Sequence, residues 1–160
     1  MGTLITAATI MALYLNLAGN MNSRYFYNAD IENGKVTTMY VYDRQGESLS
    51  GKMEYRYAYD GQGRVTVRVV YAVSAGNGMM EPVSHYDYRY TADGYSLTHS
   101  RWDRLRGCFA PADSRTDYRA EGTGLVSVSA YGLRGCGSDA TPADRFMAIV
   151  PADGGMAAEF

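Results

Sequence analysis

The sequence predicts an all-β fold, an antiparallel β-meander of about seven to nine strands. Between residues 25 and 102 the dominant period of the side-chain pattern is two, which puts alternate side chains on opposite faces of a strand. Turn motifs rich in Asp and Gly separate these stretches, at spacings too short for helices. Few segments after residue 20 carry a helical period. We therefore expect a body of consecutive hairpins.

Tyrosine occupies alternate positions in two of the expected strands. One strand lies around residues 55–59 and the other around residues 86–90, and each presents three rings on one face, namely Tyr55, Tyr57, Tyr59, Tyr86, Tyr88 and Tyr90. A third strand, around residues 65–69, alternates valine with polar residues, as a half-buried strand does.

A recurring turn joins these strands. Residues 40–46 align with residues 57–63, and in both copies Tyr-Asp is followed three residues later by Gly. The aspartate of such a motif bonds backbone amides two or three residues on, and the glycine supplies a positive φ. Residues 90–94 form a looser copy, Asn33-Gly34 signals a two-residue hairpin, and residues 76–78 signal a longer hairpin loop. Each strand is expected to end at its Tyr-Asp pair.

The N-terminus carries a continuous apolar run over residues 4–18. A membrane-spanning helix needs about 20 apolar residues, whereas the apolar centre of a secretory signal peptide is shorter. No Lys or Arg precedes the run, and the alternative is an N-terminal helix packed on the sheet. We expect a signal peptide over residues 1–20, export to the periplasm or cell surface, and no membrane span in the mature chain. The β-meander domain then covers residues 21–139.

The C-terminal part gives weaker signals. Residues 125–131 predict one more strand, and residues 140–160 read as a loop-rich tail in which residues 146–150 could add a short strand. Cys108 and Cys136 both end a Leu-Arg-Gly-Cys tetrapeptide. In an oxidising compartment they would pair as a disulfide; the alternative is two unrelated thiols.

Composition excludes several functions. The formal net charge of −2 disfavours nucleic-acid binding, which needs a positive surface. The two histidines do not share a ligand spacing with the cysteines, and the Asp turns lack the further carboxylates of a calcium loop, so no metal or other cofactor is expected. His85 and Asp87 could act as a base and its orienting group, but no nucleophile motif accompanies them.

Two resemblances follow from these motifs. The Tyr-x-Tyr-Asp-x-x-Gly unit resembles the YD repeats of Rhs-type surface and toxin proteins. Residues 40–118 are similar to an uncharacterised family of small exported Bacteroidetes proteins, a domain of unknown function, through the YD-type hairpin, Glu81-Pro82, the tyrosine strand and the Ser-Arg-Trp-Asp motif at residues 100–103. This resemblance implies export and a β-meander, and it implies no activity or catalytic residue.

The tyrosine face is the sequence feature with the clearest functional potential. If open, it would form a platform for stacking against a carbohydrate or contacting a protein; if covered, it would be part of the core. We therefore expect a non-catalytic exported binding or interaction module. The alternatives are a structural scaffold that associates through its sheet edge and a hydrolase that uses His85.

Overall fold

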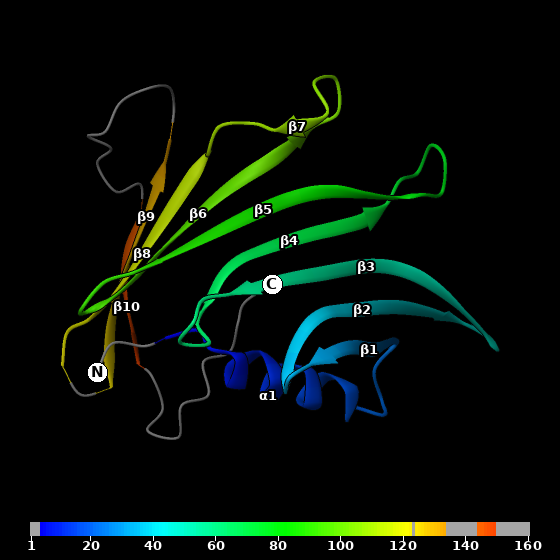
Figure 1. The fold of residues 1–160 in the computed structure, drawn as a ribbon, viewed down its shortest axis with the longest axis horizontal. Helices are drawn as coiled ribbons and strands as arrows, with labels where there is room; N and C mark the ends of the chain where they lie inside the picture. The colour runs from blue at the N-terminus through cyan, green and yellow to red at the C-terminus, as the bar shows by residue number, and fades with distance from the viewer. Residues whose placement is uncertain (1–3, 123, 134–143, 150–160) are drawn as a thin grey trace.

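The computed structural model describes residues 4–122, 124–133 and 144–149, and it confirms the all-β meander (Figure 1). One antiparallel sheet of ten strands follows a single helix, and its strands pair in the order β1-β2-β3-β4-β5-β6-β8-β9-β10, with β7 paired to β6 alone. Each strand except β8 therefore pairs with its predecessor in the sequence. The elements are α1 (Ala7–Ala18), β1 (Tyr25–Glu32), β2 (Lys35–Gln45), β3 (Ser48–Tyr59), β4 (Val65–Val73), β5 (Met80–Tyr90), β6 (Gly94–Asp103), β7 (Cys108–Phe109), β8 (Ser114–Ala120), β9 (Leu125–Gly132) and β10 (Asp144–Ile149).

Two of the predicted turns form as expected. Asn33 and Gly34 join β1 to β2, and their φ angles of 50° and 73° fit a two-residue hairpin turn. Between β3 and β4, the Asp60 carboxylate accepts 2.9 Å hydrogen bonds from the backbone N–H groups of Gln62 and Arg64. Gly63 has a φ of 75° in the same turn. The carboxylate thus replaces the sheet partners that these amides lack.

The first copy of the motif behaves differently. The prediction that its strand ends at Asp43 is wrong, because β2 continues to Gln45 and the positive φ of 64° lies at Gly46. Asp43 instead accepts two 2.9 Å hydrogen bonds from the Arg24 guanidinium, close to its cross-strand partner Tyr25. With its carboxylate paired across strands, this aspartate does not cap a turn.

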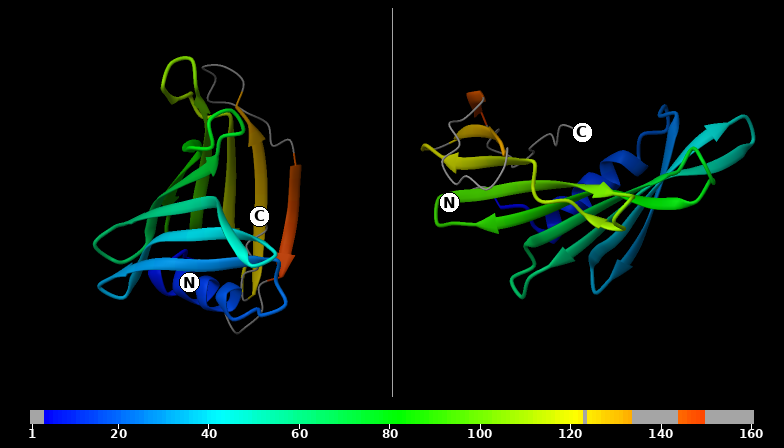
Figure 2. Two further views of the ribbon diagram at one scale, coloured as in Figure 1. Left: turned by 90° about the vertical axis from the view of Figure 1, so that its right-hand side faces the viewer. Right: turned by 90° about the horizontal axis from the view of Figure 1, so that it is seen from above.

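The sheet curves, and α1 lies on its concave side (Figures 1 and 2). Irregular pairing interrupts the ladders β1–β2, β2–β3, β3–β4 and β4–β5. Such bulges increase the local twist of a sheet and bend the strand that carries them. They therefore help to curve the sheet around the concave face.

Helix α1 begins at a capping box formed by Thr6 and Thr9. Its Ile10 packs with residues from three strands in the main core, which consists of Ile10, Val36, Met39, Tyr57 and Val65. Immediately before the helix, Thr6 forms a β-bridge with Arg64. Within the described residues, no helix has the length and apolarity needed to cross a membrane. The structure thus shows the helix packed on the sheet, and removal of residues 1–20 stays a prediction.

The predicted strand near the C-terminus is present as β9. Beyond it, β10 pairs antiparallel with β9, so part of the segment expected as a tail adds a strand to the sheet. Its bounds overlap the short strand considered for residues 146–150. Because β1 and β10 end the path of paired strands, they form the two edges of the described sheet.

Candidate functional site

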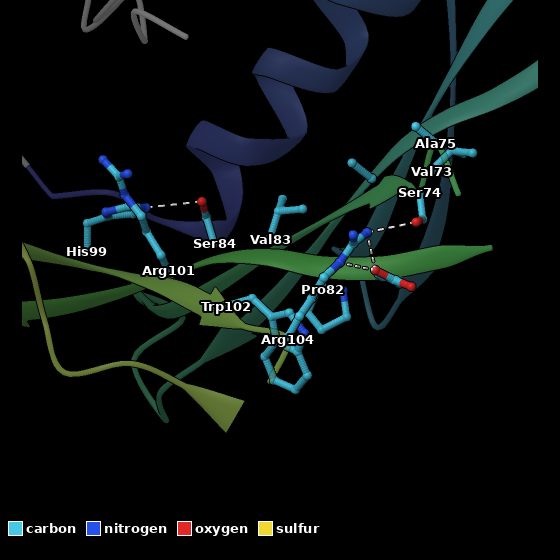
Figure 3. Close-up of a pocket in the computed structure, with 12 residues that line it drawn as sticks. Val73, Ser74, Ala75, Pro82, Val83, Ser84, His99, Arg101, Trp102 and Arg104 are labelled. Carbon is cyan, nitrogen blue, oxygen red and sulfur yellow. Dashed lines mark hydrogen bonds and ion pairs between the residues drawn. The ribbon is translucent and has the colours of Figure 1, made fainter. Parts of the chain in front are cut away.

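A cleft of about 380 Å³ opens where β4 and β6 end and β5 begins, beside the β4–β5 hairpin loop. We call it the β4–β6 cleft (Figure 3). Apolar and polar side chains both line it: Ala72, Val73, Ser74, Ala75, Glu81, Pro82, Val83, Ser84, His99, Arg101, Trp102 and Arg104. This mixture of apolar surface and a few fixed polar groups is typical of ligand sites.

One wall of the cleft is a chain of hydrogen-bonded side chains. Nε2 of His99 lies 3.0 Å from Oγ of Ser84, and Nδ1 of His99 lies 2.7 Å from Oδ1 of Asp113. Arg101 Nε lies 2.9 Å from the other oxygen of the same carboxylate. Burial alone would raise the pKa of Asp113. The hydrogen bond with His99 and the Arg101 charge lower that pKa by more, so it lies below its usual range.

The opposite wall is held by Arg104. Its Nε donates to Glu81 at 2.8 Å and its Nη2 donates to Ser74 at 2.7 Å, and Figure 3 shows the side chain reaching across to Ser74. Trp102 also lines the cleft, and its ring packs edge-on against that of Phe109, which in turn contacts His85, with Trp102 and Phe109 centroids 5.0 Å apart. The polar groups are therefore fixed before any ligand arrives.

Ser84, His99 and Asp113 have the order of groups found in a Ser-His-Asp triad. Acyl transfer also requires N–H donors aimed at the developing oxyanion. Ser84 lies inside β5, where it pairs with Val70 on one side and Arg101 on the other. The order of the three groups alone therefore does not assign acyl transfer. The register of β4 against β5 shifts beside Ser84, and the hydrogen bonds of Ser84, His99 and Asp113 hold these three side chains in place.

The six tyrosines do not form an open platform in this structure. Tyr57 is only 8% exposed, and Tyr55, Tyr59 and Tyr88 pack against the core that contains α1. The Tyr90 hydroxyl lies within hydrogen-bond distance of two backbone carbonyl oxygens, at 2.8 and 2.7 Å. Tyr86 is the one that contacts the cleft, through the His99 ring at 4.8 Å. Ligand binding by these rings stays a prediction.

His85 lies on the opposite face of β5 from Ser84. Its Nδ1 is 3.3 Å from Asp87 Oδ2, as the shared strand face predicts, and its ring packs 5.1 Å from that of Phe109. The strand that carries His85 is not a sheet edge, since β5 lies between β4 and β6. Among the described residues, no three His, Cys, Asp or Glu side chains are grouped as metal ligands.

The cysteine prediction is not tested. Cys108 is exposed on β7, while Cys136 lies outside the described residues. The pairing of Cys108 with Cys136 therefore stays a prediction.

Comparison of the sequence with known protein families identifies one match. A family of unknown function, DUF3836, matches residues 2–119. The chain belongs to this family. No protein of curated function matches the chain. The family match confirms the expected domain of unknown function, while export and the likeness to YD repeats stay predictions.

Solved structures of similar fold come from Bacteroidales. A Bacteroides fragilis protein of unknown function has a TM-score of 0.65 and 21% identity, covering 83% of this chain and 96% of its own. A DUF3836 protein from Bacteroides vulgatus has a TM-score of 0.52 and 20% identity, covering 54% of this chain and 89% of its own. At these identities the likeness shows the fold of DUF3836 and no more.

Sequence reasoning missed the residues of the cleft in this DUF3836 chain. His99 was given no role, although the alternation of β6 places it on the same face as Leu97 and Tyr95. Its contact with Ser84 depends on the register of β5 against β6, and its contact with Asp113 depends on where β8 begins. Neither quantity is visible in a single sequence.

Proposed function

We propose that the protein is an exported, non-catalytic binding module that holds a carbohydrate in the β4–β6 cleft. The observation that supports this most is the two sets of hydrogen-bonded polar side chains in one cleft, Ser84–His99–Asp113 and Arg104 with Glu81 and Ser74. Arg101 and Arg104 each pair with a carboxylate and are largely exposed, so that further N–H groups can donate to a ligand. Export is supported by the apolar run at the N-terminus, and the YD-like hairpins fit a surface protein.

The balance of charges favours a ligand rich in hydroxyl groups. Arg101 and Arg104 are offset by Asp113 and Glu81, so the cleft carries little net charge when His99 is neutral. Sugar hydroxyls can both donate to carboxylates and accept from guanidinium groups, while the apolar face of a sugar ring packs on an aromatic side chain. The volume lies within the usual range of small-ligand sites.

The single tryptophan of the chain provides the test, because it lines the cleft. Titrating the protein with cellohexaose, mannohexaose, xylohexaose and hexagalacturonate is expected to give a saturable change in Trp102 emission with at least one of them. Arg104→Gln should weaken that binding about tenfold or more, because it removes a charge-assisted hydrogen-bond donor.

Arg106→Gln is the matched control. Arg106 lies in the same loop, is highly exposed and pairs with Asp103 away from the cleft. It should bind as the unchanged chain does. An emission that responds to none of the four saccharides, or a response that Arg104→Gln leaves intact, would show that the cleft is not a carbohydrate site.

The scaffold alternative also has an observation in its favour. The edge strand β1 carries Phe26 and Ile31, both exposed on the surface. An apolar edge can pair with a second sheet, whether from another copy or from another protein. Sedimentation at increasing protein concentration, without saccharide, distinguishes an associating scaffold from a monomeric binding module.

A further inference from the structure

Arg68 lies in the middle of the concave face without a carboxylate partner. It is the cross-strand partner of Tyr57 on one side and of Tyr86 on the other. Its Nε is buried and makes no hydrogen bond. Among the described residues, none of the ion pairs involves this guanidinium, although the other buried guanidinium nitrogen, Nε of Arg115, lies 3.1 Å from Asp117.

The surroundings of Arg68 are aromatic. Its guanidinium carbon lies 4.3 Å from the centroid of the Tyr86 ring. Burial raises the pKa of both Tyr57 and Tyr88, and the Arg68 charge opposes that rise. A cation–π contact offsets part of the cost of removing a cation from water, but it does not neutralise the charge. An incoming anion would supply the missing counter-charge.

Arg68 does not line the β4–β6 cleft, but one ring separates it from His99, which does. Tyr86 links the two, since its ring touches Arg68 on one side and His99, at 4.8 Å, on the other. Ser84 and Tyr86 are two residues apart on β5 and therefore share a face. The Arg68 side chain is only partly buried as a whole. A ligand that extends from the cleft across Tyr86 would thus reach it.

We propose that Arg68 is the anion subsite of this surface and that the saccharide is an acidic one, with a sugar carboxylate bound at the guanidinium. This inference rests on the proposed function and adds the class of sugar. The cleft contributes contacts to hydroxyl groups, and Arg68 donates to the carboxylate beyond Tyr86. A neutral saccharide would leave the positive charge of Arg68 without an anionic partner.

The experiment compares hexagalacturonate with its methyl ester, which keeps the sugar rings and removes the charges. Binding is followed through Trp102 emission and by calorimetry. We expect the ester to bind about tenfold more weakly, and Arg68→Gln to weaken binding of the acid to the same degree while leaving that of the ester unchanged. Arg68→Lys keeps the charge and should retain part of the preference.

Arg89→Gln is the control, because Arg89 is exposed on the opposite face of β5. Thermal unfolding of each variant shows whether it is folded. If acid and ester bind equally, or if only neutral saccharides bind, the anion subsite is wrong while the carbohydrate site stands. If no saccharide binds, the proposed function itself fails, so the two failures are distinguishable.

Discussion

Gly94 shows most directly how a single residue can fix the pairing of two strands. A Cβ at this position would overlap with the carbonyl oxygen of Tyr118 on β8. Gly94→Ala must therefore push β6 and β8 apart, and we expect it to lower the free energy of unfolding by about 1–3 kcal/mol. Urea denaturation measures the change.

Gly61→Ala is the comparison for Gly94→Ala. Gly61 lies in the β3–β4 turn, where an added Cβ meets nothing within 4 Å. The change should stay within about 0.5 kcal/mol. Equal effects at the two glycines would contradict the close approach of β6 and β8.

Residue-scale prediction succeeded where the cause is local. The Asn33-Gly34 turn and the Asp60 carboxylate act on atoms a few residues away, so a short motif contains all that is needed. Asp43 stands in the same motif, yet its partner Arg24 lies 19 residues away in the sequence, just before β1 begins. The same limit applies to His99, whose partners are fixed only once three strands are in register.

At the scale of elements, α1 packs on the sheet with Ile10 as its buried residue, while Met11, Tyr14 and Leu17 are partly buried against the same core. Ile10 is 6% exposed, whereas Leu15 on the same helix is 59% exposed. In a chain that retains the helix, Ile10→Ala should cost about 2–4 kcal/mol and Leu15→Ala little. Denaturation of both variants, with intact mass to define the N-terminus, measures this.

The two outcomes of the helix experiment have different meanings. A large loss for Ile10→Ala alone would identify α1 as part of the folded protein. If the exported chain begins after residue 20, the two variants become identical after processing, and the apolar core around Met39 and Val65 faces solvent or a new partner. The sequence pattern allowed both readings because an apolar run of this length suits a leader and a packed helix equally.

For the molecule as a whole, the buried tyrosines set the alkaline limit of stability. Burial raises the pKa of Tyr59 to about 12, and its hydroxyl donates a 2.6 Å hydrogen bond to the Val36 carbonyl. Burial also raises the pKa values of Tyr57, Tyr90 and Tyr95. An unfolded tyrosine has a pKa of about 10.

These raised values predict the direction of the pH dependence. Folded tyrosine keeps its proton at a pH where unfolded tyrosine has lost it, so stability is complete below about pH 10 and falls as pH rises toward 12. The urea midpoint should decrease over that window, together with a rise in tyrosinate absorbance. Tyr59→Phe should make the decrease shallower; an unchanged slope would show that Tyr59 ionises freely in the folded state.

The sequential order of the sheet bears on how such a protein changes length during evolution. DUF3836 matches the chain as far as residue 119, within β8, and β9 and β10 follow as one further antiparallel pair. Because each new strand contacts only the last one, a hairpin can be gained or lost at this end without altering an earlier pairing. Homologues are therefore expected to differ by whole hairpins, while the cleft between β4 and β6 keeps its walls.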